Sequence, residues 1–131
     1  MQHKNGISIF AIEDDDAIRY TLGMVLESVG YSVSYATNGR EALEQLEREG
    51  LPDLILLDML MPVMDGWQFA ARLHDRYGNL VPVIVMTAAS NSHQRAFEVH
   101  AEGCVSKPFS IEHILAEIER VLDAKGLRKA A

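Results

Sequence analysis

The stretch Leu54-Ile55-Leu56-Leu57-Asp58 is an apolar run that ends in a carboxylate. A run of this length and composition is typical of a β-strand that is buried on both faces, as in a parallel sheet. A short loop at 59–66 follows it, and a helical pattern of apolar residues begins after the loop. Ligands of open parallel sheets collect at the carboxyl ends of the strands, so Asp58 stands where a binding or reactive side chain is expected.

Four other segments repeat this apolar pattern. The predicted strands, in chain order, are Ile7–Ile12, Ser32–Ala36, Leu54–Asp58, Val83–Thr87 and Cys104–Ser106. Segments with apolar residues at helical spacing alternate with them, and 91–101 is the weakest of these. Alternating strands and helices with short links predict parallel strands joined by right-handed crossovers. We therefore expect an α/β fold, a doubly wound five-stranded parallel sheet with five helices in a three-layer sandwich.

Turn and cap residues agree with these boundaries. Asn38 followed by Glu41, and Asp65 followed by Gln68, are typical of capping boxes at helix starts. An acid at 15–16 is expected to cap the first helix. Glycines favour the residue that follows a helix, which predicts helix ends at Gly30, Gly50, Gly78 and Gly103.

The composition limits the possible functions. The chain has 131 residues, 48% hydrophobic and 24% charged, which predicts one soluble globular domain over 1–131 with a short tail at 126–131. A net charge of -7 argues against binding to nucleic acid or to an anionic membrane surface, because both need clustered Lys and Arg. Cys104 is the single cysteine, which fits a reducing, cytoplasmic compartment. No apolar run approaches the roughly 20 residues of a membrane-spanning helix.

Polar residues stand at the carboxyl ends of four predicted strands. Glu13 and Asp14 follow the first strand, Asp58 ends the third, Thr87 ends the fourth and Lys107 follows the last. Each has a common structural explanation: a helix cap for the acids, a strand residue for the threonine and a solvated surface charge for the lysine. Together at one edge of a sheet they favour a single site. In it a divalent cation such as Mg²⁺ and the lysine would neutralise charge while Asp58 acts as a nucleophile toward a phosphoryl group.

Four motifs occur in a fixed order: Glu13-Asp14, the segment 58–66 (DMLMPVMDG), Thr87-Ala88 and Lys107-Pro108-Phe109. With these motifs the chain resembles the receiver domain of bacterial response regulators, the aspartate-phosphorylated half of two-component signalling, from about Ile7 to Leu122. The resemblance is to the single-domain, chemotaxis-regulator type and implies a flavodoxin-like sheet with strand order 2-1-3-4-5. It also implies a role in phosphorelay signal transduction through switched protein–protein contacts.

The resemblance assigns a chemical role to each residue at a strand end. Asp58 would accept a phosphoryl group from the phosphohistidine of a sensor histidine kinase or a histidine phosphotransfer protein. Thr87 would move toward that group, and Lys107 would pair with it, next to a cis Lys107–Pro108 bond. Mg²⁺ would be held by carboxylate oxygens and one backbone carbonyl, from Glu13, Asp14, Asp58 and Leu60.

Two departures from the family pattern affect switching and hydrolysis. Cys104 stands three residues before the lysine, where the family usually has an aromatic switch residue. We expect it to pack as a small buried apolar side chain, with redox sensing as the alternative. Leu60 and Ala89 flank the expected phosphoryl site, and neither apolar side chain can orient an attacking water. We therefore expect slow self-dephosphorylation and no turnover of an external substrate.

Other functions fit these residues less well. A phosphatase of the haloacid-dehalogenase type would carry a second acid at the place of Leu60. A nucleotide or flavin binder would need a glycine-rich loop where this chain has four acids at 13–16. A degenerate receiver that serves only as an interaction module would not keep the whole set of site residues.

Three further features complete the expectations. His93 and His100 would lie about 10 Å apart along one helix, which is too far to share a metal ion, so we expect both at the surface. The apolar loop 59–64 is expected to leave part of its surface exposed for docking a kinase helix. No effector domain follows Leu127, which fits either a stand-alone regulator with an unidentified downstream protein effector or an excised receiver domain.

Overall fold

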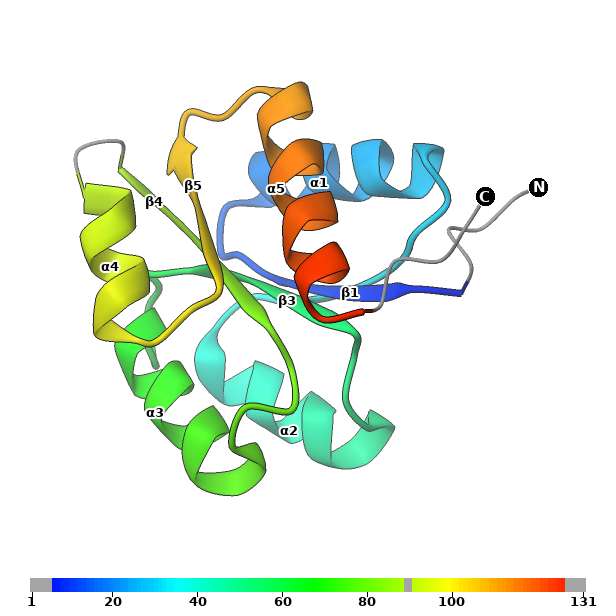
Figure 1. Ribbon diagram of the computed structural model, residues 1–131. Helices are drawn as coiled ribbons and strands as arrows, with labels where there is room; N and C mark the ends of the chain where they lie inside the picture. Colours follow the sequence, from blue (N-terminus) through cyan, green and yellow to red (C-terminus); the bar gives the residue numbers. More distant parts are fainter. Residues whose placement is uncertain (1–5, 89–90, 127–131) are drawn as a thin grey trace.

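A five-stranded parallel sheet forms the centre of the molecule (Figure 1). The computed structural model describes residues 6–88 and 91–126. The strands lie in the order β2-β1-β3-β4-β5, which confirms the predicted flavodoxin-like order. Their bounds are β1 Ser8–Ile12, β2 Ser32–Ala36, β3 Leu54–Asp58, β4 Val83–Ala88 and β5 Gly103–Lys107.

Five helices connect the strands and cover both faces of the sheet. Their bounds are α1 Asp16–Ser28, α2 Gly39–Glu49, α3 Gly66–Tyr77, α4 Ser92–Glu98 and α5 Ile111–Ala124. Helices α1 and α5 pack on one face, and α2, α3 and α4 pack on the other (Figure 1). Among the described residues, no helix has the length and apolar character that crossing a bilayer requires.

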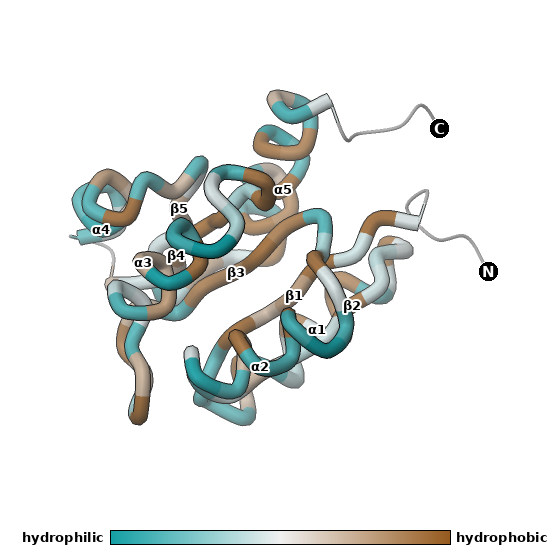
Figure 2. The backbone as a smooth tube through the Cα atoms, turned by 90° about the horizontal axis from the view of Figure 1, so that it is seen from below, coloured by the Kyte–Doolittle hydropathy of each residue, from teal (hydrophilic) through white to brown (hydrophobic). Residues whose placement is uncertain are grey.

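The sheet divides the core into two apolar layers. Successive strand residues point to opposite faces, so Phe10 packs in the layer that contains Phe69 of α3, whereas Ile9 packs with Leu22 of α1 and Ile118 of α5. This arrangement explains why the central strands are continuous apolar runs, which Figure 2 shows as hydrophobic colour along β1 and β3. It also places every residue of β3, Asp58 included, in the interior.

The register of the strands brings their carboxyl ends to one edge. Ile12 of β1 pairs with Leu57 of β3, and Asp58 pairs with Met86 of β4. Thr87 of β4 in turn pairs with a residue of β5 that precedes Lys107 by one position. The residues that end or follow these strands are therefore neighbours in space although they are far apart in the sequence.

The helix starts largely follow the predicted caps. Asp15 is the residue that caps α1, and it accepts a hydrogen bond from the backbone N–H of Ile18. Asp65 and Gln68 form the complete capping box predicted for α3. Asn38 caps α2, but Glu41 accepts from the N–H of Thr37 rather than from the cap residue itself, so this box is only half formed.

Two predicted boundaries are wrong. Gly103 does not follow a helix but opens β5, which is longer than expected and includes Lys107 as its last residue. Helix α4 covers only Ser92–Glu98 of the predicted 91–101, and the chain then turns at His100, which has a φ of 56°. The segment has too few apolar residues at helical spacing to bury a longer helix.

Candidate functional site

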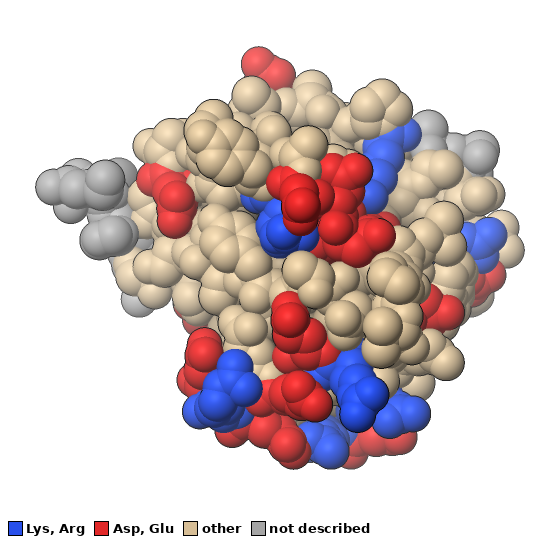
Figure 3. Space-filling model, turned by 180° about the vertical axis from the view of Figure 1, so that it is seen from behind, with Lys and Arg blue, Asp and Glu red and all other residues tan. Residues whose placement is uncertain are grey.

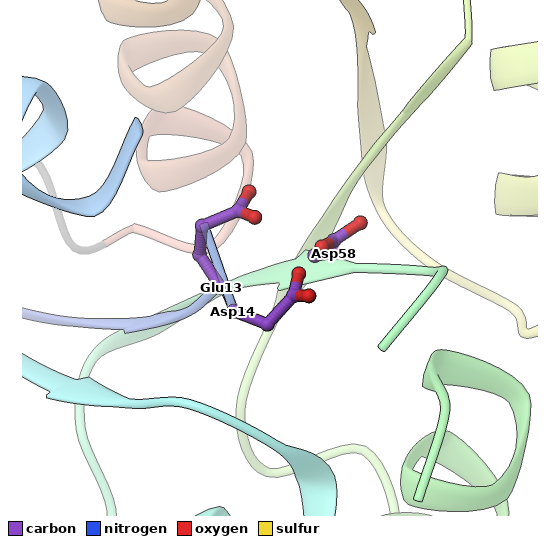
Figure 4. Close-up of side chains that lie close together, drawn as sticks. All are labelled: Glu13, Asp14 and Asp58. Carbon is purple, nitrogen blue, oxygen red and sulfur yellow. The ribbon is translucent and has the colours of Figure 1, made fainter. Parts of the chain in front are cut away.

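Three acidic side chains meet where β1 and β3 end. Glu13 and Asp14 follow β1 directly, and Asp58 is the last residue of β3. Each offers a carboxylate oxygen, and these atoms all lie within 4.8 Å of one another. Figure 4 shows the three side chains next to one another at the two strand ends. Such close like charges repel, so the arrangement calls for a cation.

Lys107 supplies one positive charge from the end of β5. Its Nζ lies 3.0 Å from Glu13 Oε1 and 3.3 Å from Asp58 Oδ1. Burial alone would lower the pKa of the Lys107 ammonium, but the hydrogen bond to Glu13 and the charge of Asp58 outweigh it and raise the pKa. The lysine is therefore charged at neutral pH and is shared between two carboxylates.

One ammonium does not balance three carboxylates. Glu13 is fully buried, and apart from the Lys107 ammonium its Oε1 has no hydrogen-bond partner among the described residues. Burial raises the pKa of Asp58 to about 7, with further contributions from the hydrogen bond and charge of Glu13 and the hydrogen bond with Asp14, while Lys107 opposes the shift. A buried cluster of three carboxylates that pairs with a single ammonium is a site that a hard divalent cation would complete.

The remaining predicted residues line the same cavity. It has a volume of about 930 Å³, and its walls include Leu60, Thr87 and Lys107 together with the three acids. Thr87 is buried at the end of β4 and Leu60 lies largely exposed at the rim. The backbone N–H of Leu60 donates to Asp58 Oδ1 at 3.2 Å. The structure thus brings together all six residues to which the sequence assigned a chemical role in the site, and the role of the Leu60 carbonyl stays a prediction.

Sequence reasoning missed a second basic residue beside the acidic loop. Arg19 of α1 donates from Nη1 to the backbone carbonyl of Glu13 at 2.9 Å, and its Nη2 pairs with Asp16. Figure 3 shows acidic side chains grouped with basic ones beside them on one face of the molecule. The position of Arg19, three residues after Asp16, was the available signal, because residues at that spacing lie next to each other on a helix. It holds the acidic loop in shape without occupying the cavity.

Apolar residues line part of the cavity. Ala17 and Ile18 of α1 contribute to its lining, as do Pro108 and Phe109, which follow β5. The Lys107–Pro108 bond is cis, as the resemblance predicted. The cavity is therefore acidic at its floor and apolar over part of its lining, which suits a small anionic group carried by a larger, partly apolar partner.

Several other predicted features lie outside this cavity. Cys104 packs against the core but is only half-buried, and its Sγ lies 3.4 Å from Nδ1 of His93. His93 and His100 are both exposed as predicted, although His100 lies beyond the end of α4 and faces His74, with ring centroids 6.2 Å apart. Ala89 and the tail residues 127–131 lie outside the described residues, so the predictions made for them stay untested.

The apolar loop after Asp58 is divided between the core and the surface. Met59 is fully buried, and Met61 and Met64 pack against the core from partly buried positions. Leu60 and Val63 are exposed, at 68% and 71%. Part of the loop therefore covers the sheet and part is accessible, as predicted, while its docking role stays a prediction.

Comparison with known proteins identifies the family. The model of the response regulator receiver domain matches residues 9–119. The chain belongs to the response regulator receiver domains. The response regulator MprA of Mycobacterium leprae is 37% identical over 116 residues, which cover 87% of this chain and 50% of that protein. The chain thus spans about half the length of the curated relatives that it matches.

Solved structures of receiver proteins have the same architecture. The chemotaxis response regulator CheY4 of Vibrio cholerae is 31% identical, with a TM-score of 0.81 over 89% of this chain and 99% of that one. The signal receiver domain of a signal transduction histidine kinase from Syntrophus aciditrophicus is 30% identical, with a TM-score of 0.82 over 96% of each chain. The receiver domain described here therefore belongs to two-component phosphorelay signalling, in which phosphorylation on an aspartate is characteristic.

Proposed function

We propose that this receiver domain takes a phosphoryl group onto Asp58 and thereby changes its contacts with other proteins. The observation that carries the proposal is the setting of Asp58, a carboxylate that is 3% exposed on the floor of an open cavity, 3.3 Å from the Lys107 ammonium. A strand-ending cap needs none of these neighbours. A phosphoryl acceptor needs all of them, because the transferred group brings negative charge that must be neutralised.

The proposed chemistry is a single in-line displacement. An oxygen of ionised Asp58 attacks the phosphorus of a phosphohistidine, forming a P–O bond as the P–N bond breaks, and the imidazole nitrogen keeps the electron pair and takes up a proton. The Lys107 ammonium is placed to pair with an oxygen of the transferred group. The Thr87 hydroxyl, which lines the same cavity, can donate a hydrogen bond to another.

We propose Mg²⁺ as the cation of the site. Glu13, Asp14 and Asp58 supply the carboxylates, and the backbone carbonyl of Leu60 would be a further ligand. The buried Glu13 Oε1, which has the Lys107 ammonium as its single partner among the described residues, and the all-oxygen donor set fit a hard cation of this kind. When bound, the ion would supply positive charge beside the acceptor and offset the repulsion among the three acids.

We expect no turnover of an external substrate. The side chain of Leu60 at the cavity rim has no polar atom with which to orient water or donate a proton. The aspartyl phosphate would therefore be hydrolysed slowly, because the side chain of Leu60 cannot activate a water molecule. A phosphatase would need an acid there.

The proposed donor is a sensor histidine kinase or a histidine phosphotransfer protein in the cytoplasm, and the proposed recipient of the signal is a downstream protein effector. A net charge of -7 disfavours direct contact with nucleic acid. Residues 1–131 would act as one receiver domain, either alone or joined to an effector.

The test is the intact mass of the protein after incubation with acetyl phosphate and Mg²⁺. We expect the gain of one phosphoryl group in the wild type, and none in Asp58→Ala or when Mg²⁺ is omitted. Asp75→Ala, which removes an exposed acid of α3, is the matched control and should be modified as the wild type is. An adduct that persists in Asp58→Ala would refute the assignment of the acceptor, and Mg²⁺ binding without any adduct would favour an interaction module.

A further inference from the structure

Helix α4 is held in place by few interactions of its own. It has seven residues, its cap Asn91 makes no side-chain hydrogen bond, and only Ser92 and Ala96 of the helix are buried. A helix this short has little intrinsic stability, so its position depends on contacts with its neighbours. Its first turn is tied to β5, because Ser92 Oγ lies 3.0 Å from Ser106 Oγ.

The last turn of α4 is tied to a different element, α3. Trp67 of α3 donates from Nε1 to Glu98 Oε1 at 2.8 Å, and Arg95 donates to the same oxygen at 2.6 Å. The guanidinium carbon of Arg95 also lies 5.3 Å from the centroid of the Trp67 ring, within the range of a cation–π contact. We call Trp67, Arg95 and Glu98 the α3–α4 clasp.

The α3 side of the clasp is rigidly joined to the acceptor loop. Gly66, the residue before Trp67, donates its N–H to the carbonyl of Met59 at 3.0 Å. A Cβ built on Gly66 would meet the Met59 Cα at 2.7 Å and the backbone oxygen of Asp58 at 3.1 Å, so the two backbones are in direct contact. The α3 end of the clasp is therefore fixed relative to Asp58.

The α4 side of the clasp is joined to the same site by the chain itself. Strand β4 brings Thr87 into the cavity and ends at Ala88, and α4 is the next element along the chain, from Ser92. A displacement of β4 at the site would move α4 relative to α3. Such a movement would strain the clasp, which joins the two helices. The clasp lies outside the acceptor cavity and binds none of its proposed ligands.

We propose that the α3–α4 clasp is a latch that holds α4 in the resting position described here, with Trp67 as its positioning residue. This inference rests on the proposed function, because it concerns how occupation of Asp58 is opposed. A contact that stabilises only the resting conformation lowers the affinity of the site for any group that favours the other one. Removal of the latch therefore tightens the binding of a phosphoryl group, or of its mimic, at Asp58, although the clasp lies outside the cavity.

The test uses beryllofluoride, a stable mimic of a phosphoryl group on a carboxylate, titrated by calorimetry in saturating Mg²⁺. Trp67→Phe removes the indole donor and Glu98→Ala removes the shared acceptor. Gln94→Ala is the matched control, because Gln94 also donates to Glu98, at 3.2 Å, but from within α4. Denaturant unfolding of each variant confirms that it is folded.

We expect Trp67→Phe and Glu98→Ala each to bind beryllofluoride about threefold to tenfold more tightly than the wild type, the factor that corresponds to a partly exposed hydrogen bond to a charged group. The double variant should gain no more than the larger single effect, because both changes break one contact. Gln94→Ala should match the wild type.

Two results would overturn the inference in distinguishable ways. If the wild type binds beryllofluoride and the clasp variants bind it equally or more weakly, or if the two effects add fully, the latch is wrong and the proposed function stands. If the wild type with Mg²⁺ fails to bind it, the proposed function falls, and the latch falls with it.

Discussion

In the metal-free protein, Asp58→Asn should stabilise the fold at alkaline pH. The pKa of Asp58 is raised from its ordinary value of 3.8 to about 7, with burial as the largest cause and Glu13 next. The folded state thus keeps a proton that the unfolded chain releases. The favourable contribution of the protonated group is complete below pH 4 and is lost as the pH rises through 7.

The size of the effect follows from the shift. At about 1.4 kcal/mol for each pH unit, the raised pKa corresponds to about 4 kcal/mol, and solvent at the open side of the cavity reduces the expected value to roughly 2–4 kcal/mol. The asparagine variant cannot ionise and escapes this cost. Its free energy of unfolding should equal that of the wild type near pH 4 and exceed it by roughly 2–4 kcal/mol at pH 8.

The assay is urea unfolding in EDTA at several values from pH 4 to pH 8. Asp75→Asn, which removes one exposed acid of α3, controls for the change in net charge and should follow the wild type. Added Mg²⁺ at pH 8 should stabilise the wild type more than Asp58→Asn, because the variant lacks one ligand. Parallel curves for the wild type and Asp58→Asn, or a variant that is less stable at pH 8, would refute the reasoning.

Three further substitutions test other parts of the structure. Gly66→Ala would place a Cβ 2.7 Å from the Met59 backbone, and we expect a loss of about 1–3 kcal/mol in urea unfolding together with weaker Mg²⁺ binding; unchanged stability would contradict the packing described. Val63→Gly removes a β-branched residue at a φ of 69° and should stabilise the protein by about 0.5–1 kcal/mol, with a higher melting temperature as the readout. The pKa of Glu117 is lowered, chiefly by its hydrogen bond with Arg120, so its contribution is present at neutral pH and is lost as the pH falls through the lowered pKa of the folded state. Glu117→Gln should therefore cost about 1 kcal/mol at pH 7 and progressively less as the pH is lowered into the acid range, and a cost that does not change with pH would refute the ionic origin.

The sequence predicts the fold and the main site because both depend on local patterns. A strand buried on both faces must be a continuous apolar run, and Leu54–Asp58 is such a run. The carboxyl ends of parallel strands meet by geometry, so the polar residue at each end could be assigned to one site without coordinates. The strand order came from the family motifs, since alternation alone is compatible with several orders.

The features that sequence reasoning missed depend on tertiary placement. Trp67 and Glu98 are 31 residues apart and meet only because α3 and α4 pack on the same face of the sheet. Val63 adopts a left-handed backbone conformation, which the sequence could not predict because valine normally avoids it. Helix α4 is short because its segment offers little apolar surface to bury. The weak helical pattern of 91–101 therefore overstated the length of the helix.

The strain in the acidic cluster has a direct consequence for signalling. A site whose carboxylates were fully neutralised in the resting protein would gain little from a cation, whereas here Lys107 is the one ammonium that pairs with the cluster among the described residues, against three acids. The repulsion within the cluster destabilises the protein without a cation, and binding of a cation relieves it. The relieved free energy strengthens binding of the cation, which in turn neutralises the phosphoryl group that follows. Helix α4, held at its last turn by the clasp with α3, is the shortest of the five helices and has two buried residues with which to resist a change at that site. In the latch proposed above, the unbalanced charge at the acceptor would thus supply the driving force, and a shift of α4 would be the response.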